Sequence, residues 1–591
     1  MSNLTQPTLE EFLKNRHGDD APQNDAVFSN DPRLLIQGPA GFGKTKVMVA
    51  RMTRMMAIGK IPYPKRILLL TFSVNAALKA RQELFELIGG RNSSLDKASK
   101  ISERTFVTNY HGFCRHLLRR NGQALSTNFL DFENFTTISD EKLAQVQDVT
   151  RSLNSDEFGI IRDFNKSIKE ASFSETKRLF SKFVDIQLSK LVPLSIITFN
   201  GIIALAIKLL YLNKSLSGFY RLYFPAIFID EFQDTNVLGY WLLKTLIDDS
   251  TQLFVYGDQL QRIYGFIGAI PGILTHFRNK FDLRQIDLQK SYRFGGNPQM
   301  LQLEKNIRDL ASNPQEKSFI KPVRLPLRTF RTQAEEAQGA VQWIEEHINI
   351  DPKLSLGILV KQRGPNADAI TEELERRKIS YFWGLFSDEE PDYSTFHNIA
   401  LQKLLSISGQ KSAIGRPLAQ EHYKSVVKSV SNIGSKTFLA LTKLLAIFWK
   451  QTFSGQLQFS AEDRFYMAEE VFTQKTLKRY MEFLETKLVV STVHGAKGLE
   501  WDYVLLPDLE QDLFPHYLSL CKYCQMDCKS GPEISTENEV AFLDELSVFY
   551  VGVTRSRNGT AFSKSCNQLD IHKQSRMKEA SCFLRLAGIV E

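Results

Sequence analysis

The stretch RLLIQGPAGFGKTKVMVARM, residues 33–52, leads from a short apolar strand pattern through a glycine-rich loop into an amphipathic helical pattern. Its centre, GPAGFGKT, fits the pattern G-x-x-x-x-G-K-[ST] in the strand-to-helix context that this pattern requires. Glycines there let backbone N–H groups converge on phosphate oxygens at the start of a helix. Lys44 is then predicted to reach the β- and γ-phosphates of a nucleotide, and Thr45 to ligate Mg²⁺.

A second apolar run, in PAIFIDE at residues 225–231, ends in two adjacent carboxylates, Asp230 and Glu231. Asp230 stands where a strand-end carboxylate would hold Mg²⁺, and Glu231 where it would orient or deprotonate an attacking water. Acidic pairs at strand ends are common, so this pair alone indicates little. Together with the upstream phosphate loop, it predicts an ATPase site.

Length and composition favour a multidomain globular protein. The chain has 591 residues, of which 43% are hydrophobic and 24% charged, enough for several domains with their own cores. The net charge of +8 permits a polyanionic partner without requiring one. Six cysteines do not make a disulfide scaffold, and the N-terminus lacks a signal-peptide pattern, so we expect a cytoplasmic protein.

Short strand patterns alternate with helical patterns in two sets, which predicts two α/β domains with parallel sheets. The first set lies at residues 33–37, 66–72, 105–110, 226–230 and 251–258, and the second at 285–289, 354–361, 379–384, 487–495 and 503–509.

Each α/β domain is predicted to carry one helical insertion. The expected divisions are 1–111 with 216–282 for the first domain, 112–215 for its insertion, 283–385 with 487–591 for the second domain, and 386–486 for its short insertion. One apolar segment, residues 194–212, resembles a membrane span but contains Asn200, Gly201 and Lys208, so a buried helix is the better interpretation.

The phrase DEFQDTN, residues 230–236, resembles the corresponding motif of the UvrD/Rep/PcrA group of superfamily 1A DNA helicases. Further stretches resemble other motifs of that family, in family order over nearly the whole chain. They are residues 66–81, 107–120, 255–269, 288–294, 491–509 and 549–557, followed by SCFLRLAGI at 581–589.

The resemblance implies two RecA-like domains, 1A and 2A, with inserted helical subdomains 1B and a reduced 2B, and ATP bound between the domains. It implies ATP hydrolysis with Mg²⁺, 3′→5′ translocation on single-stranded DNA, and unwinding of duplex DNA. By position in the motifs, the residues expected to perform catalysis are Lys44, Asp230, Glu231, Gln261, Arg293 and Arg555.

The same resemblance assigns contacts with the nucleotide. Gln23 would read adenine, Tyr292 would stack on the base, Glu500 would contact the ribose, and Gln261 would sense the γ-phosphate. Arg293 and Arg555 would meet the γ-phosphate from the second domain, where cationic charge stabilises the transition state. The phosphate loop contributes Gly38, Pro39, Ala40, Gly41, Phe42, Gly43, Lys44, Thr45 and Lys46.

The resemblance also places a DNA track across both domains, for a single strand or a junction of single and double strands. Aromatic rings suit a translocating motor because stacking ignores base identity. The residues at or beside the family's DNA-contacting positions are Phe72, Asn109, Tyr110, His111, Tyr264, Phe266 and His494.

Four departures from the family pattern bear on unwinding more than on hydrolysis. Ile267 and Lys46 stand where the family usually has arginine, and Leu546 and Ser547 replace an arginine pair. The second insertion is also short. Two alternatives therefore stay open. One is a motor subunit of a DNA repair, nuclease or anti-phage complex. The other is a regulatory ATPase that does not translocate, which would leave Gln261, Arg293 and Arg555 unexplained.

The cysteine-rich stretch HYLSLCKYCQMDCKSG, residues 516–531, has two interpretations. His516, Cys521, Cys524 and Cys528 could bind Zn²⁺, with Cys566 as another candidate ligand, because thiolates and imidazole suit its tetrahedral preference. The alternative is a polar loop with free thiols, since the spacing is not that of a two-knuckle zinc site.

Overall fold

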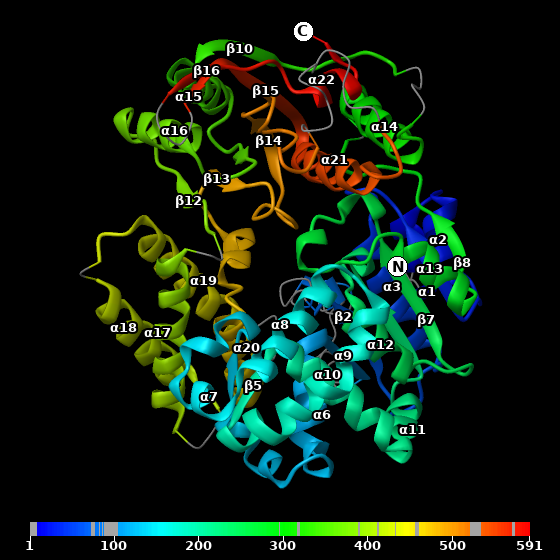
Figure 1. Ribbon diagram of the computed structural model, residues 1–591. Helices are drawn as coiled ribbons and strands as arrows, with labels where there is room; N and C mark the ends of the chain where they lie inside the picture. The colour runs from blue at the N-terminus through cyan, green and yellow to red at the C-terminus, as the bar shows by residue number, and fades with distance from the viewer. Residues whose placement is uncertain are drawn as a thin grey trace, which may run out of the picture.

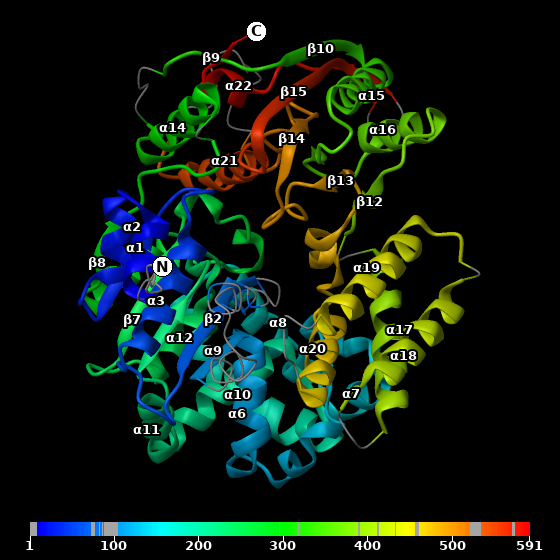
Figure 2. The same ribbon diagram turned by 180° about the vertical axis from the view of Figure 1, so that it is seen from behind.

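Two α/β parts and two helical parts lie around the centre of the molecule in a computed structural model (Figures 1 and 2). The structure describes residues 9–72, 77, 79–81, 83–84, 87, 104–294, 296–315, 320–387, 390–409, 413–431, 433–454, 460–520, 534–569 and 574–590.

The first α/β part is built on a parallel sheet of six strands in the order β3-β2-β6-β7-β1-β8. The central strands are buried along their length because helices cover both faces. The strands are β1 (Arg33–Gln37), β2 (Ile67–Thr71), β3 (Thr105–Asn109), β6 (Ala226–Ile229), β7 (Gln252–Gly257) and β8 (Arg284–Asp287). The helices are α1 (Leu9–His17), α2 (Ala21–Phe28), α3 (Lys44–Ala57), α12 (Val237–Leu246) and α13 (Ile273–Phe281).

The prediction that the pattern at 285–289 opens the second set of strands is wrong. Strand β8 pairs in parallel with β1, from Leu34 opposite Arg284 to Gln37 opposite Asp287. Only Ile286 of the strand is fully buried, as expected for an edge strand. Strand β8 stands alone between helices α13 and α14 (Pro298–Ser312), and the next strand, β9, follows α14. A strand pattern with a helix on each side fits either set of strands, so the sequence gives no local sign that β8 belongs with the preceding ones. The domain divisions themselves stay a prediction.

The second α/β part is built on the order β10-β15-β14-β11-β13-β12, with β16 antiparallel to β15. Its strands are β10 (Leu327–Thr332), β11 (Leu356–Val360), β12 (Phe382–Gly384), β13 (Leu488–Thr492), β14 (Trp501–Leu506), β15 (Ser556–Leu569) and β16 (Ser575–Met577). Its helices are α14, α15 (Gln333–Ile350), α16 (Pro365–Arg376), α21 (Glu539–Val553) and α22 (Cys582–Leu586), and β9 (Val323–Arg324) pairs with β17 (Ile589–Val590). Two parallel sheets confirm the predicted fold class.

The first helical insertion follows β3 and lies against one face of the first sheet (Figure 1). It comprises α6 (Tyr110–Asn121), α7 (Gln147–Ser152), α8 (Ser155–Lys169), α9 (Phe173–Ile186), α10 (Phe199–Leu212) and α11 (Lys214–Tyr223), with the strand pair β4 (Thr136–Ile138) and β5 (Ile196–Thr198).

The apolar segment at 194–212 forms helix α10, most of which is buried, as predicted. Within the described residues, no single helix is long and apolar enough to cross a membrane. Helices α10 and α11 pass that test only as a pair, and they are bent by 103° relative to each other.

The second helical insertion contains α17 (Pro391–Ser408), α18 (Arg416–Val430), α19 (Lys436–Thr452) and α20 (Ala461–Thr473). Its core is continuous with that of the second α/β part. It also contacts the first insertion, because Arg115 of α6 and Glu469 of α20 form an ion pair of 2.6 Å between largely buried side chains. The two insertions therefore meet in this conformation.

Two apolar side chains link the α/β parts directly. Leu260 and Ile263 follow β7 of the first part, yet they pack into the hydrophobic core of the second part. The segment after β7 is therefore held by both parts, so a movement between the parts must move this segment.

Candidate active site between the two α/β parts

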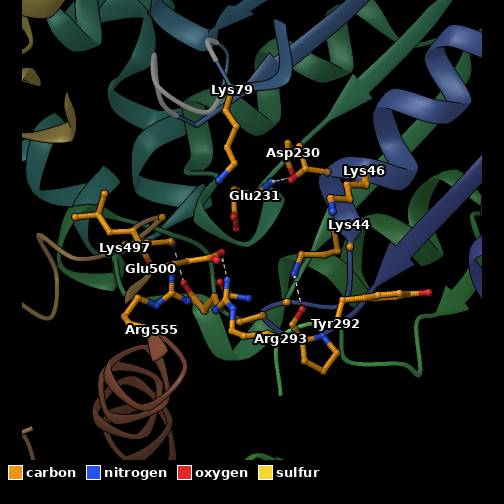
Figure 3. A pocket seen from close by; sticks show the side chains of 18 of the residues that line it. Lys44, Lys46, Lys79, Asp230, Glu231, Tyr292, Arg293, Lys497, Glu500 and Arg555 are labelled. Atoms are coloured by element: carbon orange, nitrogen blue, oxygen red, sulfur yellow. Dashed lines mark hydrogen bonds and ion pairs between the residues drawn. The ribbon is translucent and has the colours of Figure 1, made fainter. Parts of the chain in front are cut away.

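A cavity of about 600 Å³ lies between the two α/β parts (Figure 3). The first part contributes the phosphate loop and the segments after β6 and β7. The second part and the segment leading to it contribute Tyr292, Arg293, Glu500 and Arg555. The two predicted carboxylates, Asp230 and Glu231, and the two predicted arginines therefore line the same space.

The phosphate loop has the geometry that its glycines predict. Gly41 and Gly43 adopt φ of 82° and 86°, the left-handed region, and α3 begins at Lys44. The Lys44 ammonium donates to the carbonyl oxygens of Gly38 and Pro39 at 2.6 and 3.1 Å. Burial lowers the pKa of Lys44, although Asp258 and Glu231 oppose this effect. A buried ammonium on the loop carbonyls fits a phosphate-binding role.

Asp230 follows β6 directly and is buried, with Oδ1 accepting the backbone N–H of Glu231 at 3.0 Å. Burial, together with the negative charge of Glu231, raises the pKa of Asp230 to about 7. Two close carboxylates in a buried site have electrostatics that a divalent cation would relieve. Asp230 and Thr45 line the same cavity, so this donor set fits the predicted Mg²⁺.

Glu231 is held in an unusual backbone conformation. Its φ is 52°, which is rare for a residue with a side chain. The side-chain amide of Gln233 donates to the Glu231 carboxylate and accepts from the backbone N–H of Asp258 at 3.1 Å. The amide thus connects the predicted catalytic carboxylate to the segment after β7.

The predicted adenine side of the cavity is assembled from distant residues. The Gln23 amide donates to the Phe42 carbonyl oxygen at 3.0 Å, and its oxygen lies 2.7 Å from His17 Nδ1. The Tyr292 hydroxyl donates to Asp20 at 2.8 Å, while 51% of the Tyr292 residue remains exposed. An anchored ring with an open surface suits stacking on a base. Lys46 also lines the cavity, with an exposed side chain.

The two predicted arginines are both engaged with protein groups. Arg293 forms an ion pair with Glu500 and donates to the Thr554 carbonyl oxygen. Arg555 is 3% exposed and donates to the Val551 carbonyl oxygen at 3.0 Å. Burial, and then the charge of Arg293, lower the pKa of Arg555 to about 10. Glu500 therefore contacts an arginine in this structure, and its ribose contact stays a prediction.

Four of the seven residues predicted to contact DNA form a continuous row of rings. Phe72 stacks on Tyr264 with centroids 5.0 Å apart and planes at 24°. Tyr264 contacts Phe266 at 6.2 Å, and Phe266 meets His494 edge to face at 5.7 Å. Phe266 is 62% exposed. The row joins both α/β parts and offers an exposed aromatic surface.

The other three predicted DNA contacts lie apart from this row, at the start of α6. Asn109 caps the helix, its side-chain oxygen accepting the Gly112 N–H at 2.7 Å. Tyr110 is buried and bonds the Thr235 hydroxyl at 3.2 Å, and His111 packs its ring edge against Phe199. Their DNA contacts stay predictions.

Several polar residues that contact the site were not singled out from the sequence. Lys497 of the second part contacts three residues of the first part. Its ammonium lies 2.5 Å from the Asp234 carboxylate and donates to the Gln261 carbonyl oxygen at 2.7 Å. It also lies over the Tyr264 ring. Lys497 and Tyr550 fall inside the motifs at 491–509 and 549–557, which could have drawn attention to them. Arg308 and Asp258 also meet across the two parts, and nothing in the sequence near Arg308 indicated this.

The predicted zinc ligands cannot be assembled from the described residues, because Cys521, Cys524 and Cys528 lie outside them. His516 and Cys566 are described, and Cys566 is a free thiol. Among the described residues, no group of three or more His, Cys, Asp and Glu is arranged to hold a metal ion.

Comparisons with known proteins match both α/β parts. Residues 20–282 match the UvrD/REP helicase N-terminal domain, and residues 420–565 match the UvrD-like helicase C-terminal domain. The chain is 25% identical to the "Probable DNA helicase II homolog" of Mycoplasma pneumoniae over 611 residues, covering 88% of this chain and 80% of the relative. It is 22% identical to the "ATP-dependent DNA helicase PcrA" of Bacillus subtilis over 633 residues, covering 90% and 81% of the two chains.

The family matches include many of the residues that line the cavity, although Tyr292 and Arg293 lie between the two matched ranges. Lys44, Asp230 and Glu231 lie within the first match, and Glu500 and Arg555 within the second. The two matches and the two parallel sheets agree with the two RecA-like domains expected from the sequence. The chain belongs to the UvrD/Rep-like helicase family.

Proposed function

We propose that this protein is an ATP-dependent DNA helicase that hydrolyses ATP in the cavity between its α/β parts and moves 3′→5′ on single-stranded DNA. One observation carries the proposal. The phosphate loop and the Asp230–Glu231 pair of the first part share a single cavity with Arg555 of the second part and with Arg293, which the second part holds through Glu500 and Thr554. The direction of movement comes from the resemblance to the family.

The residues of the first part would bind and activate ATP. The loop N–H groups and Lys44 would hold the phosphates, and Thr45 and Asp230 would hold Mg²⁺. Mg²⁺, when bound, would neutralise phosphate charge. Glu231, fixed by the Gln233 amide, would orient the attacking water and take up its proton.

The second part would supply positive charge. Arg555 belongs to the second part, so it would reach ATP only when the two parts lie together, and Arg293 is held by Glu500 of that part. Charge from the opposite part would stabilise the transition state and couple hydrolysis to closure. Arg293 would exchange its Glu500 partner for phosphate oxygens.

A short segment would transmit the state of the nucleotide to DNA. Gln261, the predicted γ-phosphate sensor, is three residues before Tyr264 and five before Phe266 in the ring row. The Lys497 ammonium holds the Gln261 carbonyl oxygen and the Tyr264 ring together. A shift at Gln261 would therefore move the surface on which bases stack.

The proposal is tested by ATP turnover of the purified protein with and without single-stranded DNA. We expect stimulation by DNA, loss of nucleotide affinity in Lys44→Ala, and retained affinity without turnover in Glu231→Gln. Turnover that DNA does not raise, or wild-type turnover in Glu231→Gln, would overturn it.

Strand displacement on 3′-tailed and 5′-tailed duplexes then separates an autonomous helicase from a motor subunit. We expect displacement on the 3′-tailed substrate only. DNA-stimulated ATP turnover without displacement on either substrate would favour the alternative, a motor that needs other subunits to open duplexes.

A further inference from the structure

A charged contact crosses between the two α/β parts from Arg308, a residue that lies outside every motif discussed above. Arg308, on α14, reaches Asp258, which follows β7 in the first part. Its two terminal nitrogens lie 3.2 and 2.9 Å from the two Asp258 carboxylate oxygens. This two-bond geometry fixes both groups in one orientation, which a single contact would not.

Asp258 lies at the centre of the groups predicted to sense and activate ATP. Its Oδ2 accepts the side-chain amide of Gln261 at 2.7 Å, and its backbone N–H donates to Gln233. Gln233 in turn donates to the Glu231 carboxylate. A continuous series of hydrogen bonds thus leads from Arg308 to the predicted sensor and the predicted catalytic carboxylate.

The other neighbours of Arg308 tie it to the second part and to the phosphate loop. It forms an ion pair with Glu304 on its own helix and donates to the Tyr550 hydroxyl at 2.6 Å. The same hydroxyl accepts the backbone N–H of Ala40, in the phosphate loop, at 3.4 Å. Glu304 and Tyr550 therefore hold the guanidinium within the second part, and it reaches Asp258 only while the two parts are in contact.

The electrostatics give Arg308 a second effect, on Lys44. Asp258 is 2% exposed, and burial alone would raise the pKa of its carboxyl, but Arg308 and Lys44 hold that pKa below its ordinary value. Asp258 is also the carboxylate with the largest attractive effect on Lys44. Without Arg308, the buried negative charge of Asp258 would have to be balanced by Lys44, which is the group predicted to bind phosphate.

We propose that Arg308 is a positioning residue for ATP hydrolysis, which acts from the second α/β part by orienting and neutralising Asp258. When the parts are closed, it fixes the Gln261 amide and leaves Lys44 available to phosphate. When they separate, both effects are lost. This inference rests on the proposed ATPase function and adds a contact by which closure would control it.

The test uses the full chain, with ATP turnover in the presence of single-stranded DNA and nucleotide affinity measured by titration with a fluorescent ATP analogue. In Arg308→Met we expect turnover to fall by about 10- to 100-fold, because Asp258 would no longer hold the Gln261 amide in place. Nucleotide affinity should weaken by about tenfold, because Lys44 is drawn to Asp258. Arg308→Lys keeps the charge but not the two-bond geometry, so its turnover should lie in between.

The matched control is Lys305→Met, one turn earlier on α14, where an exposed ion pair with Asp309 spans 2.7 Å. Its turnover and affinity should equal those of the wild type. The double variant Arg308→Met/Asp258→Asn should regain nucleotide affinity relative to Arg308→Met without regaining turnover, because the carboxylate that competes for Lys44 is gone. A purely structural ion pair would not give that recovery.

Two results would overturn the inference: turnover of Arg308→Met within about twofold of Lys305→Met, or a double variant with weaker affinity than Arg308→Met. Failure of the proposed function looks different, since the wild type would then show no DNA-stimulated ATP turnover. If Arg308→Met does not fold, Arg308→Lys takes its place, and wild-type turnover in Arg308→Lys then overturns the inference.

Discussion

Gly41 shows how closely the phosphate loop packs against the segment that leads to the second α/β part. Its φ is 82°, and a Cβ atom added to it would lie 2.4 Å from Arg293 Cβ. The Gly41 carbonyl oxygen also accepts the Tyr292 N–H at 2.9 Å. Glycine is required here both for the backbone conformation and for the space that the arginine occupies.

Gly41→Ala should therefore lower ATP turnover by more than its backbone strain alone explains. Gly59, at the end of α3, has a φ of 74° but no atom within 4 Å of an added Cβ, so Gly59→Ala is the matched control. Both variants bear a left-handed strain of about 1–2 kcal/mol. We expect ATP turnover to fall at least about tenfold in Gly41→Ala alone, because Arg293 is displaced. Equal turnover in the two variants would contradict this account.

At the residue scale, the sequence predicted those site residues that belong to local motifs. Lys44 and the Asp230–Glu231 pair were found because loop or strand-end chemistry surrounds them. The pairing of Arg293 with Glu500 and the contact of Arg308 with Asp258 join residues more than 40 positions apart. Such pairs leave no local pattern, so the sequence could not indicate them.

At the scale of elements, prediction succeeded where strands are apolar and failed where they are polar. The central strands of the first part agree with the predicted ranges because both faces of each are buried. Strand β15 was missed, since SRNGTAFSKSCNQL is largely polar although most of its residues pair within the sheet. Its three serines and one threonine form side-chain hydrogen bonds inside the fold, which a hydrophobic pattern does not reveal.

Three buried carboxyl groups, Glu336, Asp508 and Glu510, cluster where α15 packs near the end of β14. The Asn366 amide donates to Asp508 at 2.6 Å and to Glu336 at 3.2 Å. Burial, then the charge of Asp508, raise the pKa of Glu336 to about 8, and burial raises the pKa of Asp508. These carboxyl groups share a site in which charge is costly.

This cluster predicts that stability falls as pH rises. Between the ordinary carboxyl pKa and about pH 8, these carboxyl groups bind more protons in the folded chain than in the unfolded chain, so their contribution to stability is greatest at the acidic end of that range. Glu336→Gln should flatten the dependence by up to about 1.4 kcal/mol per pH unit. Thermal unfolding from about pH 5 to about pH 8 measures this, with exposed Glu372→Gln as the control. A Glu336→Gln profile parallel to the wild type would refute the explanation.

At the scale of the whole molecule, the sequence predicted two α/β parts with inserted helices, but not how the parts meet. The segment after β7 is held by side chains of both parts, so its position depends on how the parts lie together. Leu260 and Ile263 pack into the second part, Lys497 holds the Gln261 carbonyl oxygen, and Arg308 holds Asp258. Contacts between parts depend on side chains from several motifs at once, so no single stretch predicts them.

The central claim is that ATP is hydrolysed at a site completed by the second α/β part. The most direct test is the DNA-stimulated ATP turnover of Arg293→Gln, with nucleotide affinity measured alongside. The control is Arg328→Gln, which removes a half-exposed ion pair with Glu346 in the second part. We predict that Arg293→Gln loses about 10²- to 10³-fold in turnover while it still binds nucleotide. Turnover of Arg293→Gln equal to that of Arg328→Gln would contradict the claim.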